Sequence, residues 1–168
     1  MFYLELFRAL EGEKVRYLLV GGLAVNLHGV ARFTADVDIM LALDADNLGR
    51  FVVAAKRLML KPVVPVALED FADAGKMRSW IKDKGMLAFA LRPPERSAPT
   101  LDILVRPPVA FDAAHGRRVV TSVDGVPVYL AAIEDMIALK TGTGRQKDEA
   151  DILALRQIQR MKGSRNEP

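Results

Sequence analysis

The 168-residue chain has no cysteine, only two histidines and one tryptophan, and few aromatic residues overall. The lack of cysteine excludes disulfide bonds and thiolate metal sites, and it suits a reducing compartment. The longest uncharged run, Tyr17–Ala31, is too short to span a bilayer and contains Asn26 and His28. No secretory signal is visible, because Glu5 and Arg8 interrupt the first apolar residues. We therefore expect a cytoplasmic protein with no membrane partner.

A large excess of either charge is also missing, because the formal net charge is only +3. The positive excess lies from Lys140 onward, where the sequence has seven Lys or Arg residues and four acidic residues. A basic final helix attracts phosphate, RNA or an acidic partner, but a solvated helix face explains the same charges. The chain length and the 51% hydrophobic content are typical of one globular domain. We expect that domain over residues 1–162, followed by a disordered tail at 163–168.

Hydrophobic periodicity predicts helices and strands that do not alternate as regular βαβ units. The expected fold class is therefore α/β or α+β, a mixed β-sheet flanked by helices. Asp124-Gly125 predicts a two-residue hairpin turn, and Arg92–Pro99 is the least ordered loop expected. The expected helices span residues 2–12, 22–29, about 44–60, 69–82, 133–141 and 146–161, and the expected strands span 15–20, 37–43, 61–66, 86–91, 100–106, 117–123 and 126–130.

Two carboxylates open the second predicted strand, where Asp36 and Asp38 precede an apolar run. Residues two apart in a strand share a face, so both side chains project the same way. Two adjacent carboxylates repel each other, and a divalent cation between them removes that cost. Mg²⁺ prefers such oxygen ligands and leaves positions open for phosphate. Upstream, Gly21 and Gly22 close an apolar strand, where backbone N–H groups are able to approach a phosphate closely.

The Gly21-Gly22 pair, followed by Arg32-Phe33-Thr34-Ala35-Asp36-Val37-Asp38, resembles the nucleotidyltransferase signature of the DNA polymerase β superfamily. It is most similar to the small bacterial members, the minimal nucleotidyltransferases and the abortive-infection toxin type. The resemblance implies a third carboxylate on a later strand, and Asp102 within Thr100–Val105 is the candidate. Many active members have Ser after the first Gly, whereas Gly22 stands there in this chain, as in the toxin-like branch.

This resemblance implies an enzyme that moves a nucleoside monophosphate from an NTP to a hydroxyl of a protein, an RNA end or a small molecule. Asp36, Asp38 and Asp102 are then the catalytic residues and the ligands of two Mg²⁺ or Mn²⁺ ions, with Asp102 as general base. A toxin–antitoxin role, with an antitoxin or homodimer partner, is also implied. The alternative is a module of the same fold that binds a nucleotide or a partner without catalysis.

The nucleotide is expected to contact Gly21, Gly22, Arg32 and Thr34. Backbone N–H groups at the start of a helix suit an anion, and Arg32 and Thr34 are suited to hydrogen-bond a phosphate. Each residue also has a purely structural explanation: Gly21-Gly22 as a tight packing turn, Arg32 as a surface arginine, and Thr34 as a β-branched residue that starts a strand. For His28, a packed or capping side chain is expected rather than a catalytic one.

The residues from Lys140 to Asp151 resemble the Lys…Arg-x-Lys-Asp-x-x-Asp helix pair of the toxin-like branch. In that interpretation Lys140 binds nucleotide phosphate, while Asp148 and Asp151 orient Arg145 and Lys147. A helix–helix corner with local ion pairs explains the same residues equally well.

Overall fold

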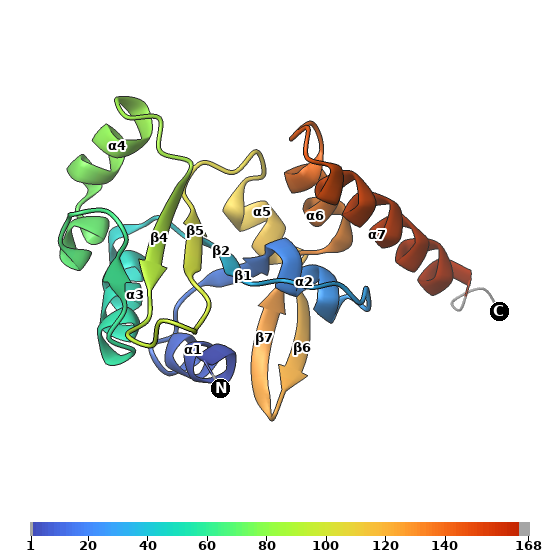
Figure 1. The fold of residues 1–168 in the computed structure, drawn as a ribbon, viewed down its shortest axis with the longest axis horizontal. Helices are drawn as coiled ribbons and strands as arrows, with labels where there is room; N and C mark the ends of the chain where they lie inside the picture. The colour runs from blue at the N-terminus through green and yellow to red at the C-terminus, as the bar shows by residue number, and fades with distance from the viewer. Residues whose placement is uncertain (1, 165–168) are drawn as a thin grey trace.

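A seven-stranded mixed β-sheet runs through the computed structural model, which describes residues 2–164 (Figure 1). Helices flank this sheet, so the expected α/β fold class is confirmed. The spatial order of the strands is β3-β4-β5-β2-β1-β7-β6. The strands span Tyr17–Val20 (β1), Val37–Leu41 (β2), Lys61–Pro62 (β3), Ala88–Arg92 (β4), Leu101–Leu104 (β5), Val119–Val123 (β6) and Val126–Leu130 (β7).

The centre of the sheet brings together the segments that carry the signature residues. Strand β2 runs antiparallel to β1 and parallel to β5. Every residue of β1 is buried, as its continuous apolar sequence predicts for a central strand. The carboxyl end of β1 therefore lies beside the amino ends of β2 and β5.

Helices flank these central strands on two sides (Figure 1). One group holds α3 and α4, the other holds α6 and the long helix α7, and α1 lies below the strands against α3 and β7. In the first group, an aromatic cluster joins α4 to the sheet, with Phe71 and Trp80 stacked on Phe89 of β4. The helices span Phe2–Gly12 (α1), Gly21–Leu27 (α2), Ala45–Arg57 (α3), Ala74–Lys82 (α4), Phe111–Gly116 (α5), Ile133–Lys140 (α6) and Gln146–Ser164 (α7).

Local chemistry explains several of these boundaries. The side chain of Asp44 accepts a hydrogen bond from the Asn47 backbone N–H at 3.0 Å, and this cap starts α3. The predicted hairpin is present between β6 and β7, with positive φ angles at both Asp124 and Gly125. Two positive φ values in a row match the twist of a hairpin turn, which is why this dipeptide is a strong signal.

The largest differences from the sequence-based expectation are four. The helix expected over 69–82 is split into a 3-10 helix, Leu68–Ala72, and α4, because Asp73 caps α4 by accepting from Lys76 N–H. The segment 61–66, expected as a strand end or edge strand because of its prolines, does lie at the sheet edge but pairs over only two residues. Helix α5 was not predicted. Helix α7 includes residues 163 and 164, which were expected in the tail, and 165–168 lie outside the described residues.

No helix within residues 2–164 is long and apolar enough to cross a membrane.

Candidate functional site

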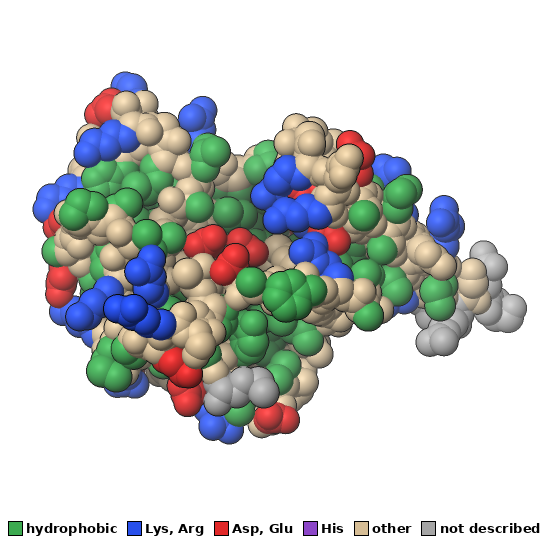
Figure 2. Space-filling model, in the orientation of Figure 1, with side chains coloured by type: hydrophobic (Ala, Val, Ile, Leu, Met, Phe, Trp, Pro, Cys, Tyr) green, Lys and Arg blue, Asp and Glu red, His purple; other side chains and the backbone are tan. Residues whose placement is uncertain are grey.

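A cavity of about 620 Å³ opens where β1 ends and β2 and β5 begin. Acidic side chains gather near the centre of this face, and Lys and Arg side chains gather beside them (Figure 2). The cavity brings together all eight residues proposed as site residues from the sequence. They are Gly21, Gly22, Arg32, Thr34, Asp36, Asp38, Asp102 and Lys140.

Strand register places the acidic residues side by side. Asp38 of β2 is paired in register with Asp102 of the parallel strand β5, so both side chains leave the same face of the sheet. Asp36 lies just before β2, and its Oδ1 accepts a hydrogen bond from the Thr100 hydroxyl at 2.8 Å. The loop that leads into β5 is therefore tied to the first acidic residue of the pair.

This arrangement changes the ionisation of the acidic residues. Burial is the main cause that raises the pKa of Asp38 to about 6, and the charges of Asp102 and Asp36 add to it. Burial and the charge of Asp36 likewise raise the pKa of Asp102. Within residues 2–164, neither Asp38 nor Asp102 has a hydrogen-bond or ion-pair partner on its carboxylate. The cost of two adjacent charges is thus not offset by a neighbouring cation bound directly to them.

The glycine pair has a steric role in this geometry. Gly21 has a φ of +66°, and a Cβ atom there would lie 2.0 Å from Oδ2 of Asp38. A Cβ atom on Gly22 would lie 2.5 Å from the Thr34 hydroxyl oxygen. Any larger side chain at either position would displace the residues that line the cavity. The two glycines therefore let the start of α2 lie directly against the acidic strand and its preceding loop.

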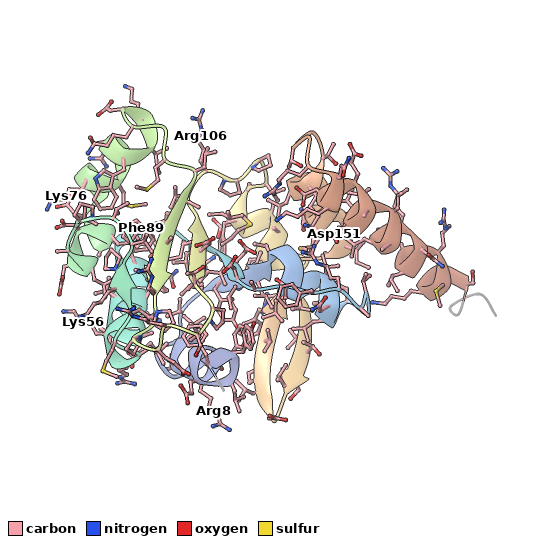
Figure 3. The ribbon with its side chains drawn as sticks, viewed as in Figure 1. Arg8, Lys56, Lys76, Phe89, Arg106 and Asp151 are labelled. Carbon is pink, nitrogen blue, oxygen red and sulfur yellow. The ribbon has the colours of Figure 1, made fainter. Side chains whose placement is uncertain are left out.

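Buried ion pairs hold the basic side of the cavity together. The buried Lys140 Nζ lies 3.0 Å from Oδ1 of Asp148 and 2.8 Å from Oδ2 of Asp151. Asp151 also pairs with the guanidinium of Arg32, which joins α7 to the loop before β2. In Figure 3, Asp151 is labelled on the side of α7 that faces α2. Lys140 is thus held by two carboxylates, and Asp151 orients Arg32 rather than Lys147.

Asp148 is the most heavily bonded acidic residue of this group. Its Oδ2 accepts hydrogen bonds from Arg145 Nε at 2.6 Å and from the Thr143 hydroxyl at 2.7 Å. Burial alone would raise the pKa of Asp148, but the hydrogen bonds from Thr143, Lys140 and Arg145 and the charge of Lys140 outweigh it and lower that pKa. The expected orientation of Arg145 by Asp148 is therefore present.

Lys147 and Arg145 are the exposed cations of the cavity wall. Among residues 2–164, Lys147 has no ion-pair partner, and its charge lowers the pKa of Asp38 slightly. Phe33 also lines the cavity, although only its place in the signature had drawn attention to it. The signal that could have identified Phe33 was its position as an aromatic residue between the polar residues Arg32 and Thr34 in a loop.

The carboxylate oxygens that line the cavity are the kind of ligand that a hard divalent cation prefers. Asp36, Asp38 and Asp102 supply carboxylate oxygens, the ligand type that Mg²⁺ and Mn²⁺ accept. Within the described part of the chain, no three His, Cys, Asp or Glu side chains are already grouped tightly enough to hold a metal ion. The acidic residues therefore face one space without forming a preassembled ligand cage.

His28 lies outside this chemistry, as the sequence predicted. Its Nε2 lies 2.8 Å from the Ala131 carbonyl oxygen, and the ring is buried. Burial lowers its pKa, which favours a neutral ring with Nε2–H donating to that carbonyl.

No protein-family model and no curated protein sequence matches the chain. Several solved structures are similar to it in fold. A lincosamide antibiotic adenylyltransferase, LnuA, solved with lincomycin bound, has a TM-score of 0.61 at 20% identity, over 94% of each chain. ANT(2")-Ia, in complex with adenylyl-2"-tobramycin, has a TM-score of 0.57 at 12% identity, over 97% of this chain and 94% of that one.

A third similar structure is an antigenic nucleotidyltransferase-like protein from Paracoccidioides brasiliensis. Its TM-score is 0.56 at 19% identity, over 93% of this chain and 72% of that one. At this level of identity the likeness concerns the arrangement of helices and strands. The chain has the nucleotidyltransferase fold.

Proposed function

We propose that this chain is a Mg²⁺-dependent nucleotidyltransferase that moves a nucleoside monophosphate from an NTP to a hydroxyl of a small molecule. The observation that carries the proposal is one cavity in which three carboxylates face a set of cations, within a nucleotidyltransferase fold. A cavity with carboxylates on one side and cations on the other suits an NTP. The carboxylates would hold the metal that binds its phosphates, and the cations would stabilise the anionic pyrophosphate that leaves.

The triphosphate would lie along the basic wall. Arg145 and Lys147 are exposed there, and Arg32 is held by Asp151 on the same side. Guanidinium groups bind phosphate oxygens through paired hydrogen bonds, while an ammonium group acts as a point charge. Lys140 would contribute through its charge and by keeping Asp148 and Asp151 in place, because its amine already contacts both carboxylates.

The divalent cation would be held by Asp36, Asp38 and Asp102. When bound, it supplies positive charge that offsets the repulsion among the carboxylates and polarises the phosphate oxygens. The raised pKa of Asp38 supports this assignment, because its carboxylate is largely buried, lies near the charges of Asp102 and Asp36, and would be stabilised by an external cation.

In the reaction, the acceptor hydroxyl oxygen would form a bond to the α-phosphorus, and the bond from that phosphorus to the β-bridging oxygen would break. Asp102 would take the hydroxyl proton, because its carboxylate lines the cavity and has no hydrogen-bond or ion-pair partner within residues 2–164. Arg145 and Lys147 would neutralise the departing pyrophosphate.

Small molecules are the acceptor class that the similar structures favour. The LnuA structure contains lincomycin, and the ANT(2")-Ia structure contains adenylylated tobramycin. Both proteins are covered over 94% of their length, so they are close to this chain in size. The same names favour ATP as the nucleotide. An antitoxin or homodimer partner, and a protein or RNA acceptor, stay predictions from the sequence resemblance.

The test is transfer of label from each of the four α-³²P-labelled NTPs with Mg²⁺, using lincomycin, tobramycin and a cell-extract metabolite fraction as acceptors. We expect labelled small-molecule products from the wild-type chain. Asp102→Asn should lose transfer by about 10³-fold, the range of a general base, while still binding NTP. NTP binding without transfer to any acceptor would instead support the non-catalytic module.

A further inference from the structure

The ring of Phe33 is the most exposed large hydrophobic side chain within residues 2–164, at 88% exposure. It also lines the cavity that holds the acidic and basic residues. Leu153, Leu87 and Met59 are the next most exposed, and none of the three lines that cavity. A single exposed hydrophobic side chain is ordinary on a protein surface, but Phe33 differs from these three because it lies among the residues that line a charged cavity.

The backbone around Phe33 is fixed on both sides. Arg32 Nε donates to the Phe33 carbonyl oxygen at 3.2 Å, and the same guanidinium pairs with Asp151 of α7. On the other side, Thr34 lies against Gly22 so closely that no Cβ atom fits between them. The ring itself has no aromatic or cation–π partner among the described residues. The loop thus holds the ring at the rim instead of letting it pack into the protein.

We propose that Phe33 is the stacking platform for the nucleobase of the NTP, an inference that rests on the proposed function. Its neighbours Arg32 and Thr34 line the same cavity as the phosphate-binding side chains. A nucleotide whose phosphates lie between the basic wall and the carboxylates must direct its base out of that charged space. An apolar aromatic face at the rim offers that base a stacking surface.

Stacking also predicts a pattern of specificity. Every base has a π-face, so stacking on a phenyl ring tolerates all four bases. Purines present the larger face, and they should therefore depend more on the ring than pyrimidines do. The polar groups of the cavity would then select the triphosphate, and Phe33 would add affinity for the base.

The test compares ATP with inorganic tripolyphosphate, which carries the phosphates but no base. Dissociation constants of both are measured with Mg²⁺ by calorimetry for the wild-type chain and Phe33→Ala. We expect Phe33→Ala to weaken ATP binding about tenfold and to leave tripolyphosphate binding unchanged. Leu153→Ala is the matched control, an exposed apolar residue of α7 outside the cavity, and it should change neither constant.

A fluorescent variant keeps the proposal testable if Phe33→Ala does not fold. In Phe33→Trp, ATP should quench the new indole emission and tripolyphosphate should not, and the native Trp80 is buried away from the cavity. Equal loss of ATP and tripolyphosphate binding in Phe33→Ala, or no loss of either, would overturn the stacking role while leaving the proposed function intact. A wild-type chain that binds neither ligand would overturn both.

Discussion

Two pairs of acidic residues, one on the sheet and one on α7, have different surroundings. Asp38 and Asp102 of the sheet have no cation bonded to their carboxylates within residues 2–164. Asp148 and Asp151 of α7 are buried and each contacts Lys140, with Arg145 and Arg32 as further partners. The pKa of Asp38 is accordingly raised and that of Asp148 is lowered.

The difference is whether the chain's own cations neutralise the carboxylates. A carboxylate whose charge is neutralised by the chain's own cations completes the structure, and it positions those cations. A carboxylate that is left beside another carboxylate keeps a repulsion that protonation or a bound cation would relieve. Identical Asp→Asn substitutions in the two pairs should therefore have opposite effects on stability.

The largest effect on stability is expected from Asp148→Asn. This change removes the charge that faces Lys140 and Arg145 and leaves the buried Lys140 amine with Asp151 alone. Breaking a buried pair by removing one partner costs about 3–5 kcal/mol. Urea denaturation of the wild-type chain and the variant measures this loss directly.

The control is Asp135→Asn. Asp135 is another buried carboxylate, and it pairs with Arg117 outside the residues that line the cavity. Both variants should be destabilised, but only Asp148→Asn should also weaken NTP binding, because only it releases Arg145. Wild-type stability in Asp148→Asn would show that the ion pairs on α7 contribute little to the fold.

A smaller effect of opposite sign is expected from Asp38→Asn. The folded-state pKa of Asp38, about 6, lies above its ordinary value of 3.8. Between these values the folded chain keeps a proton that the unfolded chain has released, so the stability of the wild-type chain falls as the pH rises through 6. Asp38→Asn removes this penalty, which is about 1–2 kcal/mol at pH 8 after allowance for partial exposure.

Thermal unfolding in EDTA between pH 3.5 and 8 checks this prediction. The melting temperature of Asp38→Asn should match that of the wild-type chain near pH 3.5 and exceed it by a few degrees at pH 8. A difference between the two proteins that does not depend on pH would mean that ionisation of Asp38 is not its cause.

The smallest effect is expected from Mg²⁺ itself. A ligand at ten times its dissociation constant stabilises the folded state by about 1.4 kcal/mol. Mg²⁺ at pH 8 should therefore raise the melting temperature of the wild-type chain, and Asp38→Asn and Asp102→Asn should lose most of this shift. Asp135→Asn should retain it, and NaCl at matched ionic strength separates cation binding from screening. Equal shifts in all four proteins would rule out Asp38 and Asp102 as ligands of the metal.

Local patterns in the sequence were enough to predict most of the elements around the site. Asp124-Gly125 predicted its hairpin because both residues accept a positive φ angle. The Asp36–Asp38 spacing predicted one shared face because side chains alternate along any strand. The break at Asp73 and the short helix α5 were missed, because a single cap and six residues are weak signals.

The sequence by itself determined the central strands, the spacing of Asp36 and Asp38 and the glycine turn, since each depends on neighbours within a few residues, whereas the pairing of β2 with β5 brings Asp102 beside Asp38. The tertiary structure alone decided the partners of the cations. Arg32 and Asp151 are 119 residues apart, and no spacing rule connects them. It also decided that Phe33 stays exposed while Lys140 is buried, because burial depends on how α6 and α7 pack beside the sheet.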